Sequence, residues 1–190
     1  QVRMTGEEEW GGYTIRGVTE EFTTESEMPL QLRAEGYESD EAVWEAVAED
    51  PSLAVIDAFA VPQEGSFNVG GPSFRLDGVA LSDETMQPTT IEIASSNNGG
   101  SEEVTVIGVI DQQVTIVGGL FLNQAAFDSI FAQPTSYVYF MRAAEGVDHG
   151  DLAANVESSL IQYGVQAQSI EAIIDESLAI NRGFIYQIGR

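Results

Sequence analysis

The chain has 190 residues and a formal net charge of −24, from 31 acidic and 7 basic residues. All the basic residues are arginines, and lysine is absent. Nucleic-acid binding and adsorption to anionic lipid both depend on basic side chains, so this composition argues against both roles. Like charges repel strongly in dilute buffer and are screened at molar salt, where the Debye length is about 3 Å. The composition therefore indicates a protein adapted to high salt, as in extreme halophiles.

Hydrophobic residues make up 43% of the chain, which is ordinary for a globular fold of one large domain or two small ones. Cysteine is absent, which excludes disulfides and thiolate metal sites. The longest apolar stretches, 53–61 and 114–122, are too short to cross a bilayer. The sequence starts at Gln1 without a signal-peptide pattern, so we expect a piece of a longer protein.

The first expected elements lie among acidic residues. Residues 1–10 are polar and acidic, and we expect them to be a frayed lead-in. Apolar residues with partial alternation, beginning at Tyr13, predict a strand that ends near Thr19. Residues 20–27 are predicted to be an acidic loop, and residues 29–32 a short extended segment.

Residues 39–61 predict a helix followed by a strand. Ser39 is a good N-cap, and Pro51 ends the helix. Apolar side chains recur on one helix face, at Val43, Trp44, Val47 and Ala48. A strand follows over 54–61, and together with the preceding strand this order is typical of a βαβ unit or of half of a split one.

Residues 63–72 are rich in Gly, Ser and Pro, which predicts a subdomain boundary. Beyond it the sequence is predicted to be β-rich, with strands over 73–81, 89–95, 104–110 and 114–117. The sequence Asn-Asn-Gly-Gly at 97–100, flanked by alternating apolar residues, predicts a hairpin turn. Asn123 is then expected to cap a short helix.

A second order of strand, helix and strand follows. A strand is predicted over 137–143, where aromatic and apolar residues alternate. A helix introduced by residues 148–151 is expected to end at Gly164, and residues 165–169 predict a short strand. With two βαβ units around a β-rich insertion, the sequence predicts an α+β fold.

From about Ile170 the sequence predicts a last helix. Beyond residue 178, apolar residues cover most of its circumference, and the only charged residues are Arg182 and Arg190. A helix that is apolar all round is buried in a protein core or in a membrane. Because this pattern is still running at Arg190, we expect the chain to be a domain that leads into a membrane span.

The only histidine is His149, which lies close to Asp148 and Asp151. All three are metal-ligand types, and a histidine beside carboxylates is also a candidate catalytic base. Aspartate equally caps helices, and Gly150 is typical of a turn. We therefore favour a helix N-terminus over a metal-binding or catalytic site here.

Other chemical motifs are incomplete. The acidic clusters at 7–9 and 20–21 lack the spacing and the turn glycine of a calcium-binding loop. The Gly-rich stretches at 65–71 and 97–100 match neither the phosphate-loop nor the dinucleotide fingerprint. Among 31 acidic residues, a chance pair of carboxylates says nothing about glycoside hydrolysis. We therefore assign no catalytic, cofactor-binding or metal-binding residue and no cofactor, and predict that the chain is not an enzyme.

Four segments carry a resemblance to a known family. Residues 104–110, with the sequence VTVIGVI, resemble a strand in the extracytoplasmic domains of MacB/FtsX-type ABC transporter permeases. Residues 119–132 are similar to the strand end and helix that follow in those domains, and residues 137–140 to their returning strand. Residues 177–184 resemble the stretch that leads into the next membrane helices. The likeness covers most of residues 13–188 and depends on the combination of elements.

The resemblance implies a domain of two parts. Residues 1–62 and 134–190 would form a membrane-proximal, porter-like subdomain with two βαβ units, and residues 63–133 an inserted, β-rich, sabre-like distal subdomain. Exposed apolar patches on the distal part would dock a partner. Phe67, Val69 and Phe74 are candidates, although core packing is the favoured role for each.

The resemblance also implies a function. Such a domain lies on the extracellular side of the cell membrane and couples ATP-driven motion of the membrane part to an external substrate or partner. Its implied partners are an ABC ATPase subunit on a separate chain or domain, a second copy of itself in the full-length transporter, and an extracellular protein. The alternative is a secreted or cell-surface domain that binds a solute or another protein.

Overall fold

The computed structural model describes residues 1–25, 28–62, 74–95, 100–112, 118–131, 134 and 136–172. Internal contacts divide the chain into two units, Gln1–Thr135 and Ser136–Arg190, each of which is described by itself. Both helices and strands are present, so the predicted mixed α+β class is confirmed.

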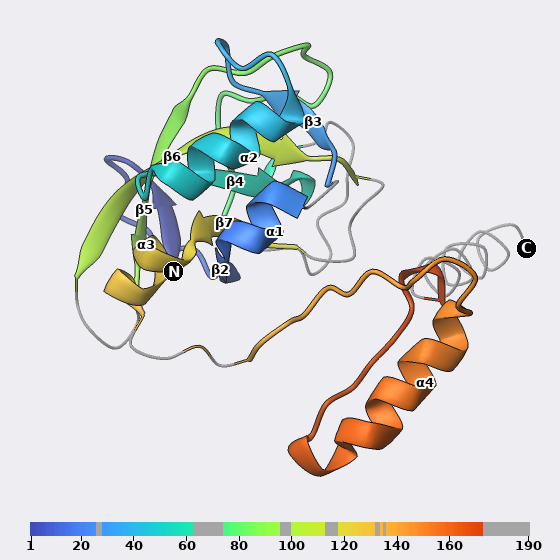
Figure 1. Ribbon diagram of the computed structural model, residues 1–190. Coiled ribbons are helices and arrows are strands. Elements are labelled where there is room, and N and C mark those ends of the chain that lie inside the picture. Colours follow the sequence, from blue (N-terminus) through green and yellow to red (C-terminus); the bar gives the residue numbers. More distant parts are fainter. Residues whose placement is uncertain are drawn as a thin grey trace, which may run out of the picture. The chain divides into compact units, whose positions relative to one another are not determined.

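The first unit is built on a seven-stranded sheet (Figure 1). Its strands are β1 (Val2–Met4), β2 (Ile15–Val18), β3 (Leu30–Arg33), β4 (Leu53–Asp57), β5 (Thr89–Ala94), β6 (Ser101–Ile110) and β7 (Leu120–Asn123). The order is β1-β5-β6-β4-β7-β2, and β3 pairs with β6. The long strand β6 pairs in parallel with β4 on one side. On its other side β6 pairs antiparallel with β5 and, further along, with β3.

Three helices, α1 (Glu20–Glu25), α2 (Asp40–Glu49) and α3 (Gln124–Ile130), lie together on the near side of this sheet in Figure 1. The indole of Trp44 on α2 is fully buried and meets the rings of Phe22 and Phe121 edge to face. Such aromatic pairs stabilise a core beyond the area that they bury. These rings therefore join α1, α2 and β7 into one core.

Several predicted elements are confirmed. The strand expected from Tyr13 to Thr19 is β2, the segment 29–32 contains most of β3, and the helix that begins after Ser39 is α2. The strands expected over 89–95 and 104–110 are β5 and β6, which pair antiparallel as the hairpin signal predicts. The turn residues 96–99 and the expected strand 114–117 lie outside the described residues.

The segments before and after β2 differ from the prediction. Residues 2–4 are not frayed, because Val2 is fully buried and β1 pairs antiparallel with β5. The expected acidic loop 20–27 contains helix α1, where the Thr19 hydroxyl accepts a hydrogen bond from the Phe22 N–H. Both predictions were wrong because each element is short and depends on packing against distant residues.

The predicted βαβ pairing of the first unit was also wrong. Strand β7 lies between β2 and β4, pairing in parallel with β2 and antiparallel with β4, so β2 and β4 run in opposite directions. The extended segment expected over 73–81 forms no strand in its described part, residues 74–81, where Gly78 adopts a φ of +78° in a turn. Strand β4, from residues 1–62, lies between β6 and β7, from residues 63–133, so both parts of the chain contribute strands to one sheet.

The second unit contains α4 (His149–Leu160) followed by the 3₁₀ helix η3 (Ile161–Tyr163). Gly164 ends this helical region with a φ of +74°, as its predicted C-cap role requires. The strands predicted over 137–143 and 165–169 are absent from the described residues. A strand exists only where its backbone pairs with a neighbour, and an alternating side-chain pattern does not supply that neighbour.

Membrane-spanning helices are a further point of the prediction. Within the described ranges, no helix is both long and apolar enough to cross a bilayer. Residues 173–190, on which the expected entry into a membrane depends, lie outside those ranges.

Candidate functional site

A buried carboxylate lies at the end of β4. Asp57 is only 5% exposed. Its Oδ1 accepts hydrogen bonds from the Tyr13 hydroxyl at 2.9 Å and from the Phe59 N–H at 2.7 Å. Its Oδ2 accepts a hydrogen bond from the Gly119 N–H. One side chain therefore joins the segment before β2, the segment after β4 and the segment before β7.

The local sequence explains this position. Asp57 is the N-cap of the 3₁₀ helix η1 (Ala58–Ala60), a position that aspartate favours. The approach to β7 requires glycine, because a Cβ at Gly118 would lie 2.9 Å from Asp57 Oδ2. A Cβ at Gly119, whose φ is +143°, would lie 3.0 Å from the Thr14 carbonyl oxygen. Two adjacent glycines thus let the chain reach the carboxylate.

Two arginines lie close to the Asp57 cluster, which consists of Asp57 and its three hydrogen-bond donors. The Nε of Arg16 donates to the Gly118 carbonyl at 2.8 Å, and Nη1 of Arg75 donates to the Phe59 carbonyl at 2.9 Å. Burial lowers the pKa of Arg16, and the charge of Asp57 opposes that shift. The arginines therefore place positive charge beside the only carboxylate that the described cluster contains.

The phenol of Tyr13 is held as a hydrogen-bond donor. Burial raises the pKa of Tyr13 above its ordinary value, the carboxylate of Asp57 raises it further, and Arg75 opposes the shift. A raised pKa favours the protonated phenol, which is the form that donates to Asp57. Since Asp57 already accepts from Tyr13 and from two backbone N–H groups, the arrangement favours a structural tie over acid–base chemistry.

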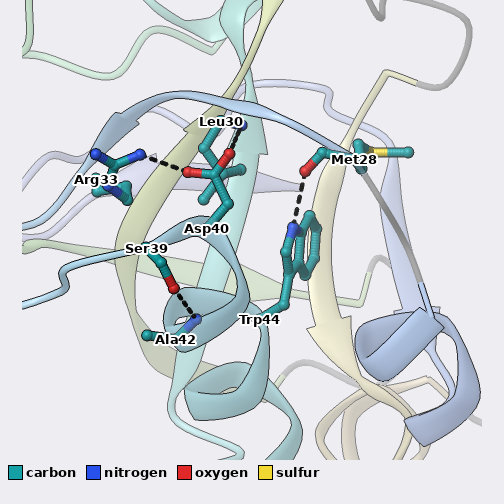
Figure 2. A network of polar contacts seen from close by, with 7 residues as sticks. All are labelled: Met28, Leu30, Arg33, Ser39, Asp40, Ala42 and Trp44. Atoms are coloured by element: carbon teal, nitrogen blue, oxygen red, sulfur yellow. Dashed lines mark hydrogen bonds and ion pairs between the residues drawn. The ribbon is translucent and has the colours of Figure 1, made fainter.

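A second polar network fixes the start of α2 (Figure 2). Asp40 Oδ2 accepts from the Leu30 N–H at 3.0 Å, and Oδ1 accepts from Nη1 of Arg33 at 2.6 Å. The Ser39 Oγ accepts from the Ala42 N–H at 3.2 Å, which confirms the predicted N-cap. The carboxylate of Asp40 thus ties the first turn of α2 to β3.

Trp44 adds a further tie in the same network (Figure 2). Its Nε1 donates to the Met28 carbonyl at 3.1 Å. The indole therefore buries its apolar surface in the core while its only donor is satisfied, as buried tryptophan requires. Both networks hold elements of the fold in place.

The predicted helix N-terminus around His149 is confirmed. The Oδ1 of Asp148 accepts from the Asp151 N–H at 2.9 Å, as an N-cap does. His149 is exposed, and its Nδ1 lies 4.0 Å from Oε2 of Glu171, which is also exposed. Within the part of the chain that the structure describes, no three His, Asp or Glu side chains are placed to hold a metal ion.

Exposed apolar side chains gather in the second unit. Helix α4 has no buried residue. The large apolar side chains exposed in this unit are Tyr137, Val138, Tyr139, Phe140, Met141, Val147, Leu160, Ile161, Tyr163 and Ile170. The rings of Tyr137 and Tyr139 stack with their centroids 6.4 Å apart.

The patch candidates proposed from the sequence are placed only in part. Phe74 is buried against the Tyr13 ring, with the ring centroids 5.6 Å apart, which confirms core packing. Phe67 and Val69 lie outside the described residues.

The chain was also compared with known proteins. No family model, curated protein or solved structure matches it. Its function must therefore be argued from its own residues.

The close approach at Gly118 gives a first prediction. Gly118→Ala places a methyl group against Asp57 Oδ2 and is expected to lower the free energy of unfolding by about 1–3 kcal/mol, the usual cost of overpacking. Gly100→Ala is the matched control, because its Cβ would meet nothing within 4 Å. Denaturant unfolding of both variants at one molar salt concentration compares them. Equal stability of the two variants would show that the contact at Gly118 is readily relieved.

Proposed function

We propose that the chain is the extracytoplasmic domain of a MacB/FtsX-type ABC transporter permease from a salt-adapted cell. The domain would lie on the extracellular side of the cell membrane and couple ATP-driven motion of the membrane part to an external substrate or partner. The resemblance of residues 104–110, 119–132, 137–140 and 177–184 to such domains motivates this proposal.

One structural observation supports it most. The described part of the second unit, residues 136–172, exposes a run of aromatic and aliphatic side chains in a chain whose net charge is −24. Helix α4 in this unit has no buried residue. Large apolar surfaces of this kind mark sites of association. A domain that transmits motion within a larger assembly needs such a surface.

The two polar networks suit the same role. A domain that transmits force benefits from elements fixed to one another, and Asp57 and Asp40 each tie several segments together. The proposal requires no catalytic group in this chain, because ATP would be hydrolysed by an ATPase subunit on a separate chain or domain. It also assigns a second copy of the permease and an extracellular protein as partners.

The native reading frame on both sides of the chain tests the proposal. We expect one membrane helix before Gln1 and several after Arg190. A signal peptide before Gln1 and a stop codon soon after Arg190 would contradict the proposal and favour a secreted binding domain. A thermal-shift screen of small solutes at molar salt would then identify the ligand class, because a ligand that binds the folded state raises the melting temperature.

A further inference from the structure

The guanidinium of Arg16 is only partly used by the fold. Arg3 forms an ion pair with Glu92 at 2.7 Å, whereas Arg16 makes a single hydrogen bond within the described residues, from Nε to the Gly118 carbonyl. An arginine has five N–H donors, so Nη1 and Nη2 of Arg16 keep theirs. In the described part of the chain, the buried side-chain atoms without a partner belong to Arg3 and Gln31 alone. Nη1 and Nη2 of the partly exposed Arg16 therefore reach solvent.

The ring of Phe59 lies at the same glycine. A Cβ at Gly118 would be 3.8 Å from Cδ2 of Phe59, so Gly118 has the Arg16 guanidinium at its carbonyl and the phenyl ring at its Cα. Phe59 is 52% exposed, and it is the only large apolar side chain that the described part of the first unit exposes. Its N–H and carbonyl are held by Asp57 and Arg75. The backbone is thus anchored while the ring faces solvent.

The buried carboxylate of Asp57 orients Arg16 without occupying it. The two charges attract each other, but both oxygens of Asp57 accept hydrogen bonds from other donors. Arg75 brings a second guanidinium to the Phe59 carbonyl. A net charge of −24 repels anions from most of this chain, whereas two guanidinium groups attract them here.

The two exposed groups define a chemical class of ligand. The planar fork of a guanidinium matches the two oxygens of a carboxylate, and a bidentate pair of this kind is stronger and more specific than a single contact. A phenyl ring half exposed to water favours an apolar partner. A doubly charged phosphate would be repelled more strongly by the acidic chain, so a singly charged carboxylate fits better.

We propose that Arg16 and Phe59 form a binding site for a small carboxylate that is joined to an apolar group. Nη1 and Nη2 of Arg16 hold the carboxylate, and the ring of Phe59 contacts the apolar group. The Asp57 cluster fixes both in advance, which lowers the entropic cost of binding. This inference goes beyond the proposed function, because the site is complete in the first unit and would serve a permease domain or a secreted domain alike.

Titration of the whole chain with phenylacetate at molar KCl tests the proposal. Shifts of the Arg16 Nε–H and of the Phe59 and Gly119 amide signals in nitrogen-15 NMR spectra would report binding at this site. Acetate has the carboxylate without the ring, and 2-phenylethanol has the ring without the carboxylate. We expect phenylacetate to bind about tenfold more tightly than either. Equal binding of acetate and phenylacetate, or no shift at these positions, would overturn the proposal.

Two variants divide the site between its parts. Arg16→Gln is expected to weaken phenylacetate binding about tenfold, the usual effect of losing a hydrogen bond to a charged group. Arg3→Gln is the matched control, since it removes the same charge from β1, at the far end of the strand order from β2. Phe59→Ala removes an exposed ring and keeps both backbone hydrogen bonds, so it should fold and bind phenylacetate no better than acetate. Unchanged binding by Phe59→Ala, or equal losses in Arg16→Gln and Arg3→Gln, would contradict the proposed site.

Discussion

Replacement of Asp57 by alanine is expected to lower the free energy of unfolding by about 3–5 kcal/mol, which is the usual cost of removing one member of a buried charged network. The substitution leaves the Tyr13 hydroxyl and the N–H groups of Phe59 and Gly119 without their acceptor. Each buried donor left unsatisfied costs about 1–3 kcal/mol. It also removes the carboxylate that faces Arg16.

The measurement is denaturant unfolding at one fixed, molar salt concentration, where the midpoint and slope report stability. Asp77→Ala is the matched control, since it makes the same charge change at an exposed position. Asp57→Asn should fall between the two, because its amide can still accept two of the three hydrogen bonds but would turn an N–H₂ group toward Gly119. If Asp57→Ala costs no more than Asp77→Ala, the cluster does not hold the fold together.

Helix N-caps and one hairpin were predictable from the sequence. The N-caps at Ser39, Asn123 and Asp148 are confirmed, each by a side-chain oxygen that accepts from an N–H three residues later. The hairpin of β5 and β6 is likewise a local event, with Ala94 opposite Ser101. These features depend on residues that are close together in the sequence, so the residue types at those positions predict them.

Pairing between distant segments was not predictable. Strand β7 has only four residues, and all four are buried, so it carries no alternation to mark it as a strand. Its partner β2 lies about a hundred positions earlier, and no feature of either sequence specifies the other. Three-residue β1 was missed for the same reason. Short strands acquire their structure from tertiary contacts, which override local preference.

The Asp57 cluster was missed for a related reason. Asp57 was placed inside a predicted strand over 54–61, although it follows an apolar run and begins η1. The Tyr13 hydroxyl lies 44 positions away in sequence, and the Gly119 N–H lies 62 positions away. The available signals were an aspartate at the end of a buried strand and the pair Gly118-Gly119. Only the sheet topology shows that they meet.

Salt is expected to have the largest effect on the stability of the whole chain. The Debye length falls from about 10 Å at 0.1 M salt to about 3 Å at 1 M, so repulsion among the 31 acidic residues is screened only at high salt. A gain of about 3 kcal/mol would raise the melting temperature of a domain of this size by about 10 °C. We therefore expect the melting temperature to rise by about 10 °C between 0.1 M and molar KCl.

Charge-reversal variants separate screening from other effects of salt. Glu7, Glu8 and Glu9 are exposed, and their replacement by lysine adds six units of charge and brings the net charge from −24 to −18. If repulsion limits stability, the triple Lys variant should melt higher than the parent chain at 0.1 M KCl and gain less from added salt. The triple Gln variant, with a net charge of −21, should fall between them.

A neutral osmolyte completes the comparison. Sucrose is excluded from protein surfaces and stabilises folded chains without screening charge. It should therefore raise the melting temperatures of the parent and of the triple Lys variant by similar amounts, whereas KCl should raise that of the parent more. A melt of the parent chain that is unchanged from 0.1 M to molar KCl would show that carboxylate repulsion does not limit this fold, and adaptation to high salt would no longer follow from its charge.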